Sequence, residues 1–386
     1  MEKKKNIYLL GLVSFLNDFS SELILPILPF FIEALGGGGF IIGLIGGIRD
    51  LISNILKIFS GYISDKIGKS KQLVFIGYFI SSIFKFFLSF SKIWEEILIF
   101  TSLERVGKGI RTSPRDSLIS KSTKEKGKGF GIHRALDTAG AIIGSIGALY
   151  LFWYMKLNFN TIILIAAIFS FLSLIPILFV KDVKSEKNSK RKLSLQLKEM
   201  PENLKKFLLI SSLFNISNFS YMFFMLYSGS YFNKESKIIL PILLYIFFNI
   251  FYAFFSIPAG KLSDRYGRKK ILLTGYALYT VTLLTFLIFN RFYLFIISFI
   301  LYGITYAIVD GNQRAFVADL TEEKIRGTAY GLFHSFTGIS LMVGNFIAGI
   351  LWKINPSSIF FFGMLFSFLS TIIFIFTKFQ KKIHTI

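Results

Sequence analysis

The stretch Gly61-Tyr-Ile-Ser-Asp65-Lys-Ile-Gly68-Lys69-Ser-Lys71 recurs as Gly260-Lys-Leu-Ser-Asp264-Arg-Tyr-Gly267-Arg268-Lys-Lys270. The two copies lie 199 residues apart, about half of the 386-residue chain. Each copy ends one long apolar run and precedes another, so each predicts a short, charged loop between two helices at the same membrane face. The sequence therefore predicts two homologous halves.

Other positions keep nearly the same offset, as a duplicated unit requires. Asp18-Phe19-Ser20 recurs as Asn218-Phe219-Ser220 at an offset of 200, and Pro114-Arg115 recurs as Gln313-Arg314 at 199. Chance matches would rarely keep one offset at several places, so the repeat extends beyond the loops.

The doubled loop resembles the cytoplasmic loop signature of the major facilitator superfamily, found between helices two and three and again between helices eight and nine. The resemblance covers the whole chain. It implies an all-α membrane protein with twelve transmembrane helices in two pseudo-symmetric six-helix halves. We assign residues 1–180 to the N-terminal half, 181–206 to a basic cytoplasmic linker and 207–386 to the C-terminal half. The chain departs from the pattern at Lys66 and Lys69, where arginine is commoner, so the charge survives but bidentate pairing does not.

The composition favours a polytopic membrane protein over several soluble domains. Apolar residues make up 53% of the chain, including 47 Phe, and charged residues only 17%. Twelve spans are expected, at about 7–34, 39–62, 72–91, 95–120, 129–154, 160–180, 207–232, 238–260, 271–290, 292–320, 326–352 and 357–378.

The Lys and Arg residues behind the net charge of +22 are distributed as in a polytopic membrane protein. With the amino terminus inside, 29 of the 44 Lys and Arg residues fall in inside segments, 9 within spans and 6 in outside segments. The positive-inside rule then predicts a multi-pass protein of the cytoplasmic (inner) membrane with both termini in the cytoplasm. The basic linker is expected to meet lipid headgroups of the bilayer, and we expect no nucleic-acid partner. The run after Lys3-Lys4-Lys5 lacks a small-residue cleavage site, so it predicts an uncleaved first span.

The sequence contains no pattern typical of a metal site or of an enzyme active site. It contains no Cys, three His and no HExxH or clustered acid–His spacing, so we expect no disulfide, metal site or cofactor. It also lacks a nucleophile–base constellation, so we expect no enzymatic activity. A monomer is expected.

Two acids of the first span, Asp18 and Glu22, are candidates for proton coupling. They lie on one helical face, and Asp18 falls near mid-membrane, where an ionised carboxylate is costly unless it is paired or hydrated. The alternative is that both acids only pair with a neighbouring helix. Arg105 is the third candidate, because Arg105-x-Gly107-x-Gly109 resembles the arginine-and-glycine pattern of span four in the superfamily's proton-coupled antiporters. The repeat partner of Asp18 is Asn218, which fits one half that handles protons and another that chiefly binds solute.

Polar positions at mid-depth are expected to line a solute cavity. Span four carries a charged stripe within an arc of about 60°, which cannot face lipid. The expected cavity residues are Arg49, Asp50, Glu104, Lys108, Arg111, Asp137, Asn215, Asn218, Tyr221 and Asp310. An ionic first half facing an aromatic, amide-lined second half suits an amphiphilic solute, while the basic excess of span four permits an anionic one.

The repeated loops are expected to form a cytoplasmic gate. Asp65 and Asp264 differ by 199, as do Arg115 and Arg314, which predicts the ion pairs Asp65–Arg115 and Asp264–Arg314 while the inside is closed. The expected gate residues are Gly61, Asp65, Gly68, Arg115, Gly260, Asp264, Gly267, Arg268 and Arg314.

These features predict a secondary active transporter that moves a small solute by alternating access, with proton coupling preferred. Within transport, the alternative is a uniporter or a sodium-coupled symporter. From another class, the alternative is a non-transporting receptor or lipid-handling scaffold on the same fold. Gly140, Gly144 and Gly147 resemble the span-five motif of drug–proton antiporters, but Ser145 stands where that motif has proline. Export is only slightly favoured.

Overall fold

The computed structural model describes residues 2–67, 70–122, 126–182, 200–288, 291–322 and 326–379. Their regular structure is helical throughout, and no strand occurs among them. The elements are α1 (Glu2–Ile24), α2 (Leu28–Ala34), α3 (Gly39–Ile67), α4 (Ser70–Leu88), α5 (Trp94–Ser122), α6 (Lys126–Leu149), the π-helical turn η1 (Tyr150–Tyr154), α7 (Phe159–Leu172), α8 (Leu174–Leu178), α10 (Glu202–Ser217), α11 (Tyr221–Gly229), α12 (Ser236–Tyr266), α13 (Arg268–Ile288), α14 (Phe292–Asp319), α15 (Arg326–Ile354) and α16 (Ser358–Phe376).

Eleven helical segments among the described residues are long and apolar enough to cross a membrane. They match eleven of the twelve expected spans. The twelfth is α5, whose 29 residues would reach roughly 43 Å but carry many charges. Its charges are sheltered, because α5 packs against α1, α3, α4 and α6. The expected all-α membrane fold is therefore confirmed.

Two expected spans are interrupted near the middle of the bundle. The first is split at residues 25–27, where Pro26 lacks the backbone N–H that a continuous helix needs. The seventh is split at residues 218–220, where the Ser220 hydroxyl accepts from the Met222 amide and starts α11. Both breaks free backbone polar groups at depth, which is tolerated where they face protein or a cavity.

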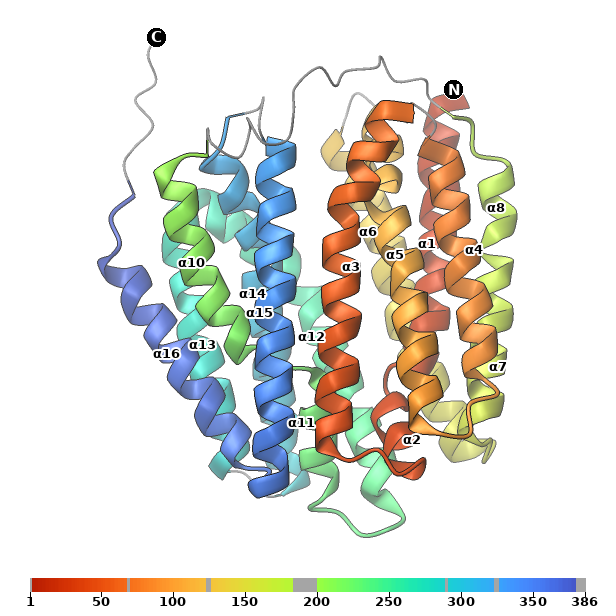
Figure 1. Cartoon of the computed structure of the whole chain (residues 1–386), viewed down its shortest axis with the longest axis vertical. Coiled ribbons are helices and arrows are strands. Elements are labelled where there is room, and N and C mark those ends of the chain that lie inside the picture. The colour runs from red at the N-terminus through yellow and green to blue at the C-terminus, as the bar shows by residue number, and fades with distance from the viewer. Residues whose placement is uncertain are drawn as a thin grey trace.

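The helices form two halves that lie side by side, coloured red to yellow-green and green to blue (Figure 1). α1 to α8 make up the first half, and α10 to α16 the second. Contacts between the halves run along α3 with α15 and α6 with α12, and also join α11 to α2 and α3. Residues 183–199 of the expected linker lie outside the described part of the chain.

The start of α1 and the end of α16 lie at the same end of the bundle (Figure 1). We call this end the terminal face and the opposite end the distal face. An even number of spans requires this arrangement.

The two halves are in close contact near the distal face. The Lys237 ammonium forms an ion pair of 2.6 Å with the Glu33 carboxylate across the halves. A Cβ atom at Gly43 of α3 would overlap the carbonyl of Asn345 in α15, so the backbones of the two helices meet there. The distal face is therefore closed.

Polar side chains deep in the bundle are reached by solvent. Asp310 precedes the end of α14 by about nine residues, or roughly 13 Å. Its side chain is nevertheless 43% exposed, and that of Arg314 is 44% exposed. Both line the space between the halves, so the bundle is open to water from the terminal face.

The interiors of the two halves differ. In the second half, aromatic rings pack on one another; for example, Phe214 stacks on Tyr276 with ring centroids 3.9 Å apart. In the first half, glycines allow close helix packing, and a Cβ at Gly140 of α6 would overlap the Phe15 carbonyl of α1. Buried charges also occupy the first half, including Lys85 and Glu104.

Candidate functional site

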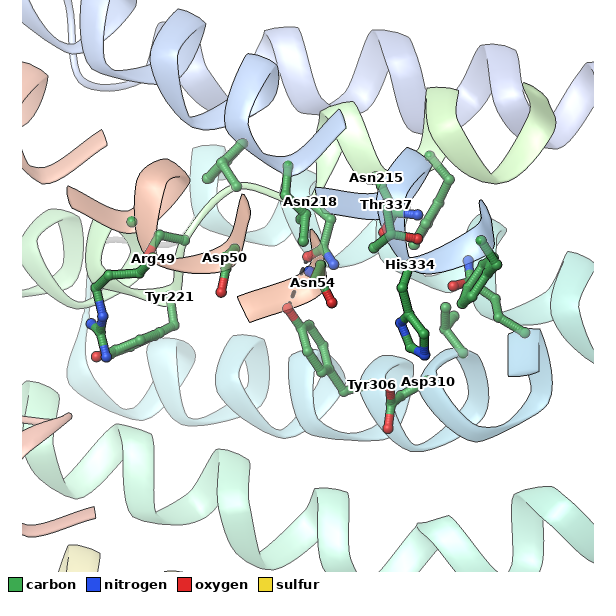
Figure 2. A pocket seen from close by; sticks show the side chains of 18 of the residues that line it. Arg49, Asp50, Asn54, Asn215, Asn218, Tyr221, Tyr306, Asp310, His334 and Thr337 are labelled. Carbon is green, nitrogen blue, oxygen red and sulfur yellow. Dashed lines mark hydrogen bonds between the residues drawn. The ribbon is translucent and has the colours of Figure 1, made fainter. Parts of the chain in front are cut away.

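A cavity of about 340 Å³ lies between the halves (Figure 2). Its volume falls at the lower end of the range of roughly 300–1,000 Å³ that small-molecule sites occupy. One wall comes from α3 and α5, and the other from α10, the start of α11 with the break before it, α13, α14 and α15. The lining includes Arg49, Asp50, Asn54, Lys57, Arg105, Phe214, Asn215, Asn218, Tyr221, Tyr279, Tyr306, Asp310, Gln313, Arg314, Phe333, His334 and Thr337.

The expected cavity residues divide into two groups. Those that line the cavity are Arg49, Asp50, Asn215, Asn218, Tyr221 and Asp310, together with Arg105 from the expected proton site and Arg314 from the expected gate. Those that lie outside this lining, within the first half, are Glu104, Lys108, Arg111 and Asp137.

The sequence interpretation missed several lining residues, and a helical periodicity could have found them. Asn54 and Lys57 continue the face of α3 that carries Arg49 and Asp50. His334 and Thr337 likewise share one face of α15, three residues apart. The Lys57 ammonium donates to the Asn54 side-chain oxygen at 2.9 Å.

Arg49 and Arg105 stand at one part of the cavity wall. The Arg49 side chain reaches toward the hydroxyl of Tyr221 (Figure 2). That hydroxyl donates to the Leu25 carbonyl at 2.9 Å, across the halves, so it can accept from the guanidinium. The Arg105 Nε atom lies 3.4 Å from a carboxylate oxygen of Glu104.

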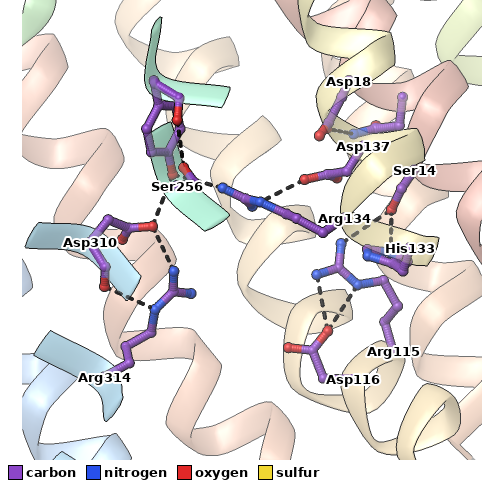
Figure 3. Close-up of polar contacts among 12 residues, drawn as sticks. Ser14, Asp18, Arg115, Asp116, His133, Arg134, Asp137, Ser256, Asp310 and Arg314 are labelled. Atoms are coloured by element: carbon purple, nitrogen blue, oxygen red, sulfur yellow. Dashed lines mark hydrogen bonds and ion pairs between the residues drawn. The ribbon is translucent and has the colours of Figure 1, made fainter. Parts of the chain in front are cut away.

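A polar chain crosses between the halves beside the cavity (Figure 3). Arg134 of α6 lies 3.2 Å from the Asp137 carboxylate and donates to the Tyr252 hydroxyl of α12 at 2.7 Å. The Tyr252 hydroxyl in turn donates to Asp310 at 3.0 Å. Arg314, one turn further along α14, pairs with the same Asp310 oxygen at 2.6 Å. The chain links a carboxylate of the first half to the cavity wall of the second.

Asp18 joins this chain through Asp137. The two carboxyl groups, on α1 and α6, lie beside each other and interact electrostatically (Figure 3). A hydrogen bond between two carboxyl groups needs a proton on one of them. Lys108, Arg115 and Arg111 are the cations that act on Asp18, whereas Arg49 and Arg105 lie by the cavity.

Glu22, one turn from Asp18, has partners from both halves. Its carboxylate accepts from the Ser145 hydroxyl of α6 at 3.0 Å and from the Asn249 amide of α12 at 3.4 Å. Asn249 also donates to Ser145 at 3.1 Å. This cluster is a second polar link between α6 and α12.

The other charges of span four point into the first half. The Arg111 guanidinium stacks on the Tyr78 ring at 4.2 Å and donates to the Ser81 hydroxyl. Ser81 in turn donates to the Glu104 carbonyl at 3.0 Å. These contacts lie between α4 and α5, away from the cavity.

The expected gate is only partly within the described residues. Gly68 lies outside the described residues. Gly61 and Asp65 belong to α3, but the surroundings of their side chains are not described. The expected ion pair Asp65–Arg115 therefore also lies outside the described part of the chain. Arg115 itself pairs with Asp116 at 3.0 Å.

In the second half, the expected pair Asp264–Arg314 is not made in this conformation, which is open at the terminal face. Asp264 pairs with Arg268, and Arg314 pairs with Asp310. Gly260 lies within α12, and Gly267 ends this helix with a φ of 96°, a backbone conformation that favours glycine.

Comparisons with known proteins cover the chain. A family model described as Major Facilitator Superfamily matches residues 10–242 and 207–384. An uncharacterised MFS-type transporter of Methanocaldococcus jannaschii is 51% identical over 379 residues, which are 97% of this chain and 95% of the relative. The multidrug resistance protein MdtH of Blochmanniella pennsylvanica is 29% identical over 37% of this chain and 35% of its own length.

Solved structures of transporters share the fold. The nucleoside transporter NupG matches with a TM-score of 0.79 at 15% identity, over 96% of this chain and 98% of its own. The human organic anion transporter MFSD10 matches with a TM-score of 0.71 at 14% identity, over 96% of this chain and 99% of its own. With long helices arranged in two halves, a cavity between them and a relative that matches over nearly the whole length, this chain belongs to the major facilitator superfamily and is a multi-pass membrane transporter.

Proposed function

We propose that this transporter couples the movement of a small amphiphilic or anionic solute to protons, by alternating access across the cytoplasmic membrane. The observation that carries the proposal is the chain from Asp18 and Asp137 through Arg134 and Tyr252 to Asp310. It joins a carboxyl pair that can hold a proton to the wall of the central cavity. Transporters of this architecture bind solute between their halves near mid-membrane.

The proton can act on the cavity through Arg134. While the Asp18–Asp137 pair holds a proton, it carries a single negative charge, and Arg134 can be shared with Tyr252. Loss of that proton adds a second negative charge beside the guanidinium. Arg134 is then drawn toward the carboxylates and away from Tyr252, which weakens the link to Asp310. Proton release thus changes the contact between the halves.

The positive-inside rule supports an orientation with the terminal face in the cytoplasm. In that orientation, the conformation described here faces inward. Export is the direction that we favour, because relatives named multidrug resistance proteins match about a third of the chain. The alternative energy source is a sodium gradient, and a uniporter would need neither.

Reconstituted proteoliposomes test the coupling. We expect the wild-type protein to drive uphill solute movement from a pH gradient and not from a sodium gradient. Asp18→Asn keeps the shape of the side chain and removes its titration, so it should abolish uphill, pH-driven transport while solute exchange remains measurable. Asp182→Asn, an exposed acid outside the chain of contacts, is the matched control. Normal pH-driven accumulation by Asp18→Asn would refute the proton site, and accumulation driven by sodium alone would refute proton coupling.

A further inference from the structure

Arg49 is a buried cation without a full set of partners. Its side chain lies in the cavity wall and the residue is 6% exposed. Among the described residues no carboxylate forms an ion pair with it, and its Nε atom has no hydrogen-bond partner. A buried charge left in this way is unfavourable, so the site favours a ligand of opposite charge.

Arg105 extends the same positive region. Its Nε atom also lacks a hydrogen bond among the described residues, because the nearest Glu104 oxygen lies 3.4 Å away without suitable geometry. Arg105 also acts on Arg49 as a like charge, while Glu104 and Asp50 act on it as opposite charges. Two neighbouring guanidinium groups that repel each other are both stabilised by one anion placed between them.

The cavity as a whole carries an excess of positive charge. Its lining holds the four cations Arg49, Lys57, Arg105 and Arg314 and the two carboxylates Asp50 and Asp310, and the Glu104 carboxylate, outside the lining, pairs with Arg105 at 3.4 Å. Asp310 is engaged by Arg314 at 2.6 Å. Lys57 donates to the neutral Asn54. An anionic solute would balance this excess, whereas a cationic one would increase it.

The wall of the second half combines aromatic rings with amide side chains such as Asn215 and Asn218. Tyr221 and Tyr306 are its partly exposed tyrosines, whereas the rings of Phe214, Tyr279 and Phe333 are buried. Figure 2 shows Arg49 toward one end of the cavity and Tyr306 and His334 further along it. A planar apolar body could lie against the Tyr306 ring while its charged group reaches the arginines.

We propose that the cavity binds an aromatic organic anion, with its acidic group held by Arg49 and Arg105 and its ring system against Tyr306. This rests on the proposed transport function, since it names the class of solute. Arg49 makes the direct contact, and Arg105 adds the second guanidinium.

Thermal unfolding of the purified full-length protein in detergent tests the proposal without any ion gradient. The probes are benzoate, 2-naphthoate and indole-3-acetate, each compared with its neutral amide and with an amine of the same ring system, at fixed pH and ionic strength. We expect saturable stabilisation by at least one carboxylate and at least tenfold weaker stabilisation by its amide and amine. Equal or stronger stabilisation by the amines, or no stabilisation by any carboxylate, would overturn the proposal.

Substitutions then locate the anion. Arg49→Gln should weaken carboxylate binding at least tenfold, and Arg49→Lys should retain part of the affinity because it keeps the charge but loses the planar fork. Arg291→Gln changes an exposed arginine near the distal face and should bind like the wild type. Unchanged carboxylate affinity in Arg49→Gln would contradict the site. If Arg49→Gln does not fold, the comparison of carboxylate, amide and amine on the wild type still decides the charge preference.

The binding result and the transport result separate the two proposals. If carboxylates bind and exchange but a pH gradient does not concentrate them, the anion site stands and proton coupling fails. If a pH gradient drives a cationic or neutral solute while carboxylates do not bind, proton coupling stands and the anion site fails.

Discussion

Tyr252→Phe removes the hydroxyl that joins Arg134 of the first half to Asp310 of the second. The change keeps the ring, so the contacts of Tyr252 with Phe248 and Tyr306 remain. It deletes two hydrogen bonds to charged partners, at 2.7 and 3.0 Å. We expect the conformation that is open at the terminal face to become less populated.

The size of the effect follows from the exposure of the partners. A hydrogen bond to a charged group contributes about 1.5–3 kcal/mol when water cannot replace it. Here the Arg134 and Asp310 side chains are 51% and 43% exposed, so water restores part of each interaction. A net loss of about 1–2 kcal/mol is expected, which shifts a two-state equilibrium about 5- to 30-fold.

Distances between spin labels measure this shift. The chain has no cysteine, so labels can be placed at Gln72→Cys and Glu322→Cys, one near the terminal face of each half. The distance distribution of Tyr252→Phe should gain a shorter component that is minor in the wild type. Tyr231→Phe deletes a tyrosine hydrogen bond within the second half near the distal face and should leave the distribution unchanged. An unchanged distribution in Tyr252→Phe would show that the link does not favour this conformation and would refute the reasoning.

Two further predictions concern packing and topology. Gly43→Ala should lower the unfolding temperature in detergent, because the added Cβ overlaps the Asn345 carbonyl. Gly311→Ala is the control and should raise the unfolding temperature slightly, because no atom lies within 4 Å of its Cβ. Equal effects of the two changes would contradict the close contact of α3 with α15. Lys234 lies toward the distal face and Arg265 toward the terminal face. In intact cells, an impermeant thiol reagent should therefore label Lys234→Cys but not Arg265→Cys. Labelling only at Arg265→Cys would place the termini outside the cell.

Much of the fold could be predicted because the sequence contains an internal repeat, so each half supports the assignment of the other. The repeated loops around Asp65 and Asp264 separate long apolar runs, and the common offset of about 200 residues pairs the halves. The breaks at residues 25–27 and 218–220 were not predicted. Apolar periodicity continues through them, and only the backbone hydrogen bonds of each segment reveal where a helix stops.

The candidate site was harder to predict because a polar helical face can meet two kinds of surroundings. Arg49 and Asp50 face the cavity, but Arg111 faces the interior of the first half, where the Ser81 hydroxyl and the Tyr78 ring contact it. A helical wheel places residues on a face and does not say what that face meets. Contacts between distant residues, such as Arg134 with Tyr252, carry no sequence signal at all.

The distribution of polar contacts restricts how one half can sense charge in the other. Near the cavity, α3 meets α15 through small and apolar surfaces, as where Gly331 lies against Ile58. Such contacts respond to shape and barely to a change of charge. The contacts between α6 and α12 are different, because Arg134 donates to Tyr252 and Asn249 reaches both Glu22 and Ser145. If protons drive transport, their effect must therefore reach the second half chiefly through the contacts between α6 and α12. The contact of α3 with α15 then serves as the surface along which the two halves rotate relative to each other.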